Sequence, residues 1–128
     1  MRDITDQKIV SVRSAAILTN SYVAGTVATQ TRALNQLVVL LQFTIGSLTS
    51  MEMKVEFSND NSTYYQETID APNSLSQYTS SVGERTFTAT GNYSIAIPVA
   101  YNFIKISVKG TGTTTDSSCT VDAVLART

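Results

Sequence analysis

Alternation of apolar and polar residues is the feature that most constrains the fold, and it dominates the chain from residue 35 onward. Residues 51–57 (MEMKVEF) alternate at every position, and the same period of two recurs in residues 93–99, 104–109 and 121–125. A period of two places successive side chains on opposite faces of a β-strand. These segments therefore predict strands that bury one face and leave the other in water.

The segment 36–45 (QLVVLLQFTI) is more continuously apolar than the others. A continuous apolar run is typical of a central strand that is buried on both faces. The same composition would suit a short helix, but Val, Phe, Thr and Ile favour a strand. Weaker strand signals lie in residues 14–18, 23–29, 64–69 and 86–89.

Short strands at intervals of about 8–12 residues, separated by turn residues, are typical of a sandwich or jelly roll. No segment keeps an apolar period of 3.6 residues over three turns. We therefore expect an all-β fold, namely a single antiparallel β-sandwich that is jelly-roll-like and has about eight strands. The expected division is an N-terminal arm or edge strand at residues 1–13 and a sandwich domain at residues 14–128.

Two segments outside the regular pattern are predicted to make contacts with partners. Residues 1–13 are charged and mixed in pattern, so they suit a first edge strand or an arm that orders on a neighbouring subunit. The segment 70–84 is rich in Ser, Asn and Gln, and long loops are often functional. We choose the contact residues by their place in these two segments and not by a motif. They are Arg2, Asp3, Ile4 and Ile9 in the arm and Asn73, Leu75 and Tyr78 in the loop.

Composition excludes several classes of chemistry. The 128 residues include no His and one Cys, which removes Ser–His and Cys–His catalytic pairs, internal disulfides and thiolate zinc clusters. A net charge of −1 argues against binding nucleic acid, which needs a basic face. The longest apolar run, residues 37–41, is far shorter than the ~20 residues that span a bilayer. We expect no catalytic, cofactor or metal site, and neither a nucleic acid nor a membrane as partner.

The carboxylates on the alternating strand do not suit catalysis. Glu52 and Glu56 share a face but lie about 13 Å apart at ~3.3 Å per residue. Paired glycosidase carboxylates lie roughly 5–9.5 Å apart. With Lys54 between them, the three side chains predict a solvated charged row, and Glu67 on the adjacent strand is a candidate partner for Lys54.

The segment 58–65 (SNDNSTYY) admits two functional interpretations and a structural one. Its Asp and Asn oxygens could bind calcium, but their spacing differs from the known calcium loop. It also resembles the Asp-box turn S-x-D-x-G-x-T-W, with Asn61 or Ser62 in place of Gly and Tyr in place of Trp. That resemblance implies a structural hairpin turn, which is the interpretation we favour.

Other side chains have a structural and a functional interpretation. Tyr64, Tyr65 and Tyr78 could supply an aromatic platform for carbohydrate, although alternation turns Tyr64 or Tyr65 inward. The remaining tyrosines considered, Tyr22, Tyr93 and Tyr101, are expected at the edge of the core with a solvated hydroxyl. The single thiol, Cys119, is expected to be a small buried hydrophobic residue.

About three quarters of the chain resembles small β-sandwich virion structural proteins of tailed bacteriophages. The resemblance rests on the spacing of the strands and on the turns, in the segments Gln36–Phe43, Met51–Tyr65, Phe87–Pro98, Phe103–Gly112 and Thr120–Arg127. It implies a capsid decoration (cement) or auxiliary head protein, located in the virion after synthesis in the host cytoplasm.

The partners implied by the resemblance are the major capsid protein or other virion subunits, together with further copies of the chain, a trimer being the first expectation. Two other functions stay open. One is a head–tail connector or tail accessory subunit, and the other is a carbohydrate-binding module for host attachment.

Overall fold

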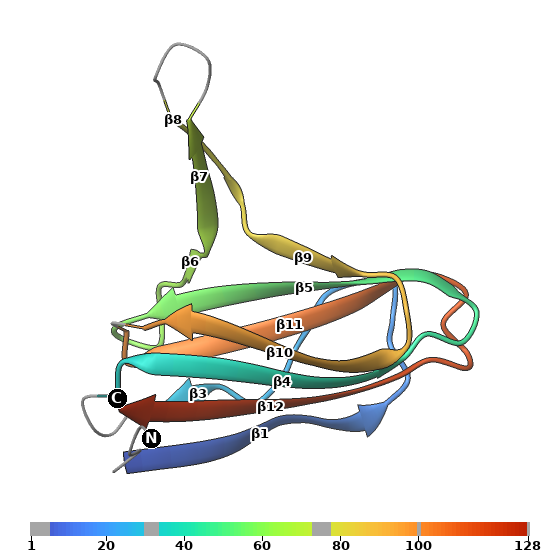
Figure 1. Ribbon diagram of the computed structural model, residues 1–128, viewed down its shortest axis with the longest axis horizontal. Helices are drawn as coiled ribbons and strands as arrows, with labels where there is room; N and C mark the ends of the chain where they lie inside the picture. The colour runs from blue at the N-terminus through green and yellow to red at the C-terminus, as the bar shows by residue number, and fades with distance from the viewer. Residues whose placement is uncertain (1–5, 30–33, 73–77, 100, 128) are drawn as a thin grey trace, which may run out of the picture.

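The computed structural model describes residues 6–29, 34–72, 78–99 and 101–127. Within these ranges the chain is all-β and contains no helix. Two antiparallel sheets pack face to face as a sandwich, and a separate two-stranded hairpin stands off from it (Figure 1). The predicted antiparallel β-sandwich is therefore confirmed.

The first sheet has four antiparallel strands in the order β1-β12-β4-β10. Their bounds are Asp6–Ala16 for β1, Ser118–Arg127 for β12, Gln36–Thr44 for β4 and Gly91–Pro98 for β10. β1 is an edge strand whose ladder with β12 runs through residue 13, with shifts of register on both sides of that residue. The N-terminal segment from residue 6 is thus part of the sheet.

The second sheet has six strands and is centred on β5 (Leu48–Ser58) and β11 (Phe103–Gly112). Four short strands extend it, namely β2 (Val23–Ala24), β3 (Ala28–Thr29), β6 (Tyr65–Gln66) and β9 (Glu84–Phe87). β2 and β3 pair with β11, whereas β6 and β9 pair with β5. The sandwich therefore has ten described strands instead of about eight, because three of these additions are only two residues long.

The predicted contact loop at residues 70–84 is wrong in its local structure. Most of this segment belongs to β7 (Thr68–Pro72) and β8 (Tyr78–Val82), which form an antiparallel hairpin, and its end enters β9. The segments TIDAP and YTSSV contain β-favouring Thr, Ile, Tyr and Val but no apolar alternation. The sequence of this hairpin therefore gives no periodic signal for a strand.

The core lies between the two sheets and consists of the inward positions of the alternating strands. The largest fully buried side chains are Leu18, Leu37, Leu41, Met51, Met53, Ile104, Ile106 and Leu125. Cys119 belongs to the same cluster and is 0% exposed, as predicted for a small buried hydrophobic residue. Burial raises the pKa of the Cys119 thiol to about 11, so this cysteine serves packing.

The prediction that the strand at residues 36–45 is buried on both faces is wrong. In β4 the inward side chains, such as Leu37 and Val39, are fully buried, but Val38 is only half-buried and Leu40 is 41% exposed. β4 is central in its sheet, yet the described residues place a second layer on one of its faces only (Figure 1).

We predict that Leu37→Ala and Leu40→Ala, a matched pair on the same strand, differ sharply in monomer stability. Truncating the buried Leu37 should lower the free energy of unfolding by about 2–5 kcal/mol, because it opens a cavity. Truncating the exposed Leu40 should cost less than about 1 kcal/mol. Urea denaturation of dilute protein measures both, and equal losses would contradict the assignment of the two faces.

Candidate functional site

The turn that joins β5 to β6 is held by its own side chains, as expected for an Asp-box-like hairpin turn. The Ser58 hydroxyl accepts from the backbone N–H groups of Asp60 (3.2 Å) and Asn61 (3.0 Å) and donates to the Asp60 carboxylate (2.9 Å). That carboxylate also accepts from the N–H groups of Ser62 and Thr63, both at 2.9 Å.

Asn61 has a left-handed backbone conformation in this turn. Its φ of 60° lies in the left-handed region, which asparagine tolerates better than most residues. The N–H groups of Thr63 and Ser62 hold the pKa of Asp60 below its ordinary value. Because Oδ1 of Asp60 is committed to the turn, the structure gives this segment a structural role.

The outer face of the six-stranded sheet carries opposite charges at facing positions of neighbouring strands, and Lys54 also lies 3.8 Å from Glu56 of its own strand. We call this outer face the charged face, and it comprises Glu52, Lys54, Glu56, Glu84, Lys105 and Lys109. Register places Glu52 opposite Lys109, Glu56 opposite Lys105 and Lys54 opposite Glu84. Opposite charges at facing positions stabilise a sheet modestly, so the three lysines and three glutamates balance within this face.

The solvated Glu–Lys–Glu row predicted for this strand is wrong at Glu52, which is 6% exposed. The hydroxyls of Ser50 and Thr111 donate to its two carboxylate oxygens, each at 2.5 Å. A buried carboxylate needs such donors to replace lost water. The glutamate is therefore enclosed by hydroxyl groups on its own strand and on β11.

The Tyr22 ring lies beside two lysine ammonium groups of the charged face. Lys54 and Lys109 each approach the Tyr22 ring to 4.8 Å, and the Tyr22 hydroxyl donates to Glu84. Burial, followed by the hydrogen bond and charge of Glu84, raises the pKa of Tyr22 above its ordinary value. Tyr22 is thus a bridge over the charged face and not the core-edge residue that was predicted.

The predicted aromatic platform is not assembled as a set of free ring faces. Lys105 lies 3.9 Å from the centre of the Tyr64 ring, and the Tyr64 hydroxyl donates to Asn61. Tyr65 is 63% exposed and Tyr64 lies on the outer face, so the expectation that alternation turns one of them inward is wrong. Tyr101 stacks on Phe57 with 5.0 Å between ring centres. Tyr93 packs beside the core as expected, and its hydroxyl donates to the Ala89 carbonyl.

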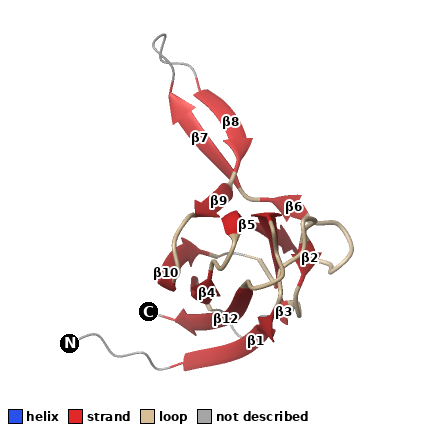
Figure 2. Cartoon of the chain, turned by 90° about the vertical axis from the view of Figure 1, so that its right-hand side faces the viewer, coloured by secondary structure: helices blue, strands red, loops and turns tan. Residues whose placement is uncertain are grey.

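The hairpin of β7 and β8 projects from the sandwich like a ribbon (Figure 2). Among the described strands, β7 and β8 pair only with each other. An isolated two-stranded hairpin is at best marginally stable in water. Its free backbone edges can add to the sheet of another molecule, which makes it a candidate docking element.

The base of the hairpin is fixed to the sandwich by a two-point ion pair. Arg85 donates to both carboxylate oxygens of Glu67, at 2.6 and 3.1 Å, instead of leaving Glu67 to pair with Lys54 as predicted. The Glu67 carbonyl accepts from Gly83 at 2.7 Å, and the Glu67 N–H donates to Val55 at 2.9 Å. These bonds connect the base of the hairpin to strand β5 of the sandwich.

The outer face of the four-stranded sheet carries a continuous apolar row. Cross-strand register aligns Ile9 of β1 with Val124 of β12, Val124 with Val38 of β4, and Val38 with Ala96 of β10. We call these four residues the apolar row. Ile9 is 65% exposed, and Val38 and Val124 are half-buried by their neighbours in the sheet. The row crosses the sheet from one edge to the other.

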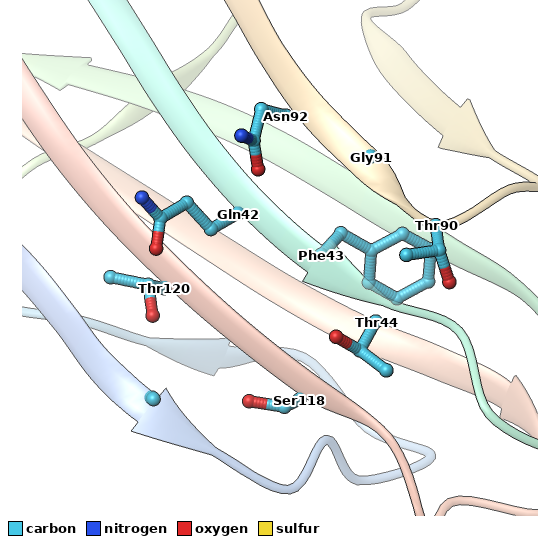
Figure 3. A pocket seen from close by; sticks show the side chains of 9 residues that line it. Gln42, Phe43, Thr44, Thr90, Gly91, Asn92, Ser118 and Thr120 are labelled. Atoms are coloured by element: carbon cyan, nitrogen blue, oxygen red, sulfur yellow. The ribbon is translucent and has the colours of Figure 1, made fainter.

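Beside the apolar row, the same face is hollowed over polar side chains. The hollow has a volume of about 310 Å³, and Figure 3 shows Gln42, Asn92, Thr120 and Ser118 around it. Its lining offers amides and hydroxyls but no acid or base. Such a surface can hydrogen-bond to a partner, but it holds no group for proton transfer. Among the described residues, no three His, Cys, Asp or Glu lie close enough to hold a metal ion.

The predicted contact residues fall in different places. Ile9 lies on the apolar row, and Tyr78 is the first residue of β8, where it pairs with Pro72. These two strands lie on opposite sides of the sandwich in both views (Figures 1 and 2). The other predicted contacts, Arg2, Asp3, Ile4, Asn73 and Leu75, lie outside the described residues. The structure therefore does not bring the arm and the hairpin together.

Sequence reasoning missed Val38, Ala96 and Val124 as surface residues. The available signal was the apolar continuity of QLVVLLQF and of AVLA, where neighbouring positions are both apolar. On a sheet with one buried face, such a run must expose part of its apolar side chains.

No family model matches the chain, and no curated protein matches it. A search of the described residues for a helix long and apolar enough to cross a membrane finds none.

We predict that Ser58→Ala destabilises the protein by about 1–2 kcal/mol, because it removes a fully buried hydroxyl that accepts from two backbone N–H groups and donates to Asp60. Thermal or urea unfolding measures the loss. Asn59→Ala, at the exposed neighbouring position, is the matched control and should be nearly neutral. A neutral Ser58→Ala would show that the turn does not depend on this hydroxyl.

Stability should also fall in acid through two turn carboxylates. Asp60 accepts the bonds described above, and Asp116 accepts from the Ser47 N–H (2.8 Å) and hydroxyl (2.9 Å), which lower the pKa of Asp116. Both carboxyls have a lower pKa folded than unfolded. Their contribution is therefore present above the ordinary carboxyl pKa of about 3.9 and is lost as pH falls below it.

The double variant Asp60→Asn and Asp116→Asn should consequently lose less thermal stability between about pH 5 and about pH 2 than the unmodified chain. Asp122→Asn, which changes a carboxyl outside both turns, is the control. An unchanged acid slope in the double variant would exclude these two turns as the acid-sensitive elements.

Proposed function

We propose that this chain is a structural subunit of a bacteriophage virion that acts by protein–protein contacts, as a capsid decoration or auxiliary head protein. The observation that carries the proposal is the projecting hairpin of β7 and β8, which pairs with no third described strand. Its partner would be the major capsid protein or another virion subunit, and its location would be the virion.

The hairpin supports docking because its base is tied to the sandwich before any partner binds. The ion pair between Glu67 and Arg85 and the backbone bonds of Glu67 hold its base. Preorganisation of this kind lowers the entropy lost on binding. A neighbour that presents a free sheet edge can pair with the hairpin through main-chain hydrogen bonds.

Surface chemistry supports contacts with proteins over catalysis. The charges of the charged face are balanced across strands, and the polar hollow contains amides and hydroxyls. Few unpaired ions would need to lose water when such surfaces are covered. Many copies bound in this way stabilise a capsid by mass action.

Several finer expectations belong to the same proposal, on the strength of the resemblance. They are a jelly-roll-like connectivity and a homo-oligomer. A head–tail connector or tail accessory role would use the same kind of contact at another place in the particle.

The test uses heads that lack this protein and a variant in which residues 68–82 are replaced by a short Gly-rich link. We expect the unmodified chain to sediment with the heads and to raise the temperature at which they open. The deletion variant should keep the unfolding behaviour of the sandwich but lose binding at least tenfold.

Asn59→Ala, an exposed substitution in the β5–β6 turn that leaves the hairpin and the apolar row intact, is the control for head binding by the hairpin. Two results would reject the proposal: an unmodified chain that does not bind heads, or a deletion variant that binds as well as the unmodified chain.

A further inference from the structure

We propose that the outer face of the four-stranded sheet is an interface between two copies of this chain, packed sheet against sheet around a two-fold axis that runs along the apolar row. This inference does not depend on the virion role, since it concerns the purified chain alone. It replaces the trimer expected from the resemblance with a pair.

The first support is the apolar row itself, which spans all four strands. Leu40, beside the row on β4, is 41% exposed, and Ile9 at its end is 65% exposed. A strand with apolar residues at consecutive positions is typical of burial on both faces. A second copy would supply the layer that β4 lacks among the described residues, at the usual sheet spacing of about 10 Å.

The second support is charge. At the outward positions of β4, β10 and β12, the one charged side chain is Asp122. The charged face of the other sheet, in contrast, carries three lysines and three glutamates. Two copies of the same face must not bring like charges together, because desolvated like charges cost several kcal/mol. The outer face of the four-stranded sheet, with Asp122 as the one carboxylate on these three strands, can pair with itself without bringing like charges together.

The cross-strand register favours a two-fold axis along the apolar row over a two-fold axis along the strands. With the axis along the apolar row, Asp122 lies opposite Ala126 of the second copy, because these residues flank Val124 on either side. Ala126 has Gln7 and Gln36 as its cross-strand neighbours, so their amide groups can donate to the carboxylate. An axis along the strands would instead place Asp122 on Leu40 of the second copy. The first arrangement also keeps the two carboxylates apart.

The third support is area. Four strands spaced about 4.8 Å apart and nine residues long at about 3.4 Å per residue cover roughly 600 Å². Two such faces bury roughly 1,200 Å² in all, the lower end of the range for specific interfaces. The face is therefore large enough for a pair that forms reversibly with concentration.

The first test is cysteine cross-linking. Position 124 faces itself across the proposed axis, so Val124→Cys should give a covalent dimer with a short bismaleimide, a thiol cross-linker whose reach suits two sheets packed about 10 Å apart. Ser94→Cys, on the same face but off the axis, and Thr86→Cys, on the charged face, should stay largely monomeric. Failure of Val124→Cys to cross-link, or equal cross-linking of all three variants, would overturn the proposal.

The second test is sedimentation equilibrium of the purified chain. We expect a reversible monomer–dimer equilibrium, and Ile9→Asp, at an exposed edge position, should weaken it at least tenfold while the circular dichroism spectrum stays unchanged. Thr86→Asp should leave the equilibrium as it is. A chain that is monomeric at high concentration, a trimer, or a dimer insensitive to Ile9→Asp would overturn the proposal.

Discussion

The burial of one face of each sheet against the other is the interaction on which the rest of the structure depends. The single thiol is buried in the core, and the described residues contain no helix that could cover either sheet. The inner faces of β4, β5 and β11 must therefore supply the hydrophobic driving force together. Alternation at every position of β5 from residue 51 to residue 57 follows from this need, since each strand can give only half of its side chains to the core.

Because the inner faces of the two sheets are buried against each other, the two outer faces are exposed to solvent. These outer faces differ in their side chains. On the charged face, lysines and glutamates occupy facing positions of neighbouring strands, and the Tyr22 ring lies beside both Lys54 and Lys109. On the other sheet, hydroxyls and amides surround an apolar row that leaves Ile9 and Leu40 exposed. The first face satisfies its charges within the sheet, whereas the second leaves apolar side chains exposed.

The hairpin of β7 and β8 forms a sheet of its own beside the two packed sheets. Its strands pair with each other, and its base is tied to the sandwich through Glu67, Arg85 and Gly83. A Cβ on Gly83 would come within 2.9 Å of the Glu67 carbonyl, so glycine permits the close approach at the base. The chain thus holds the hairpin away from the core through contacts at its base alone among the bonds described.

By itself the sequence determined the strand class, the inward residues of β5, the burial of Cys119 and the turn held by Ser58, because alternation and turn chemistry are local. Tertiary structure alone decided that Glu67 pairs with Arg85, that β4 is covered on one face, and that residues 9, 38, 96 and 124 form one row. The physical reason is that strand order and register join segments far apart in the chain. A local period shows which side chains share a face of one strand, but not which strand lies beside it.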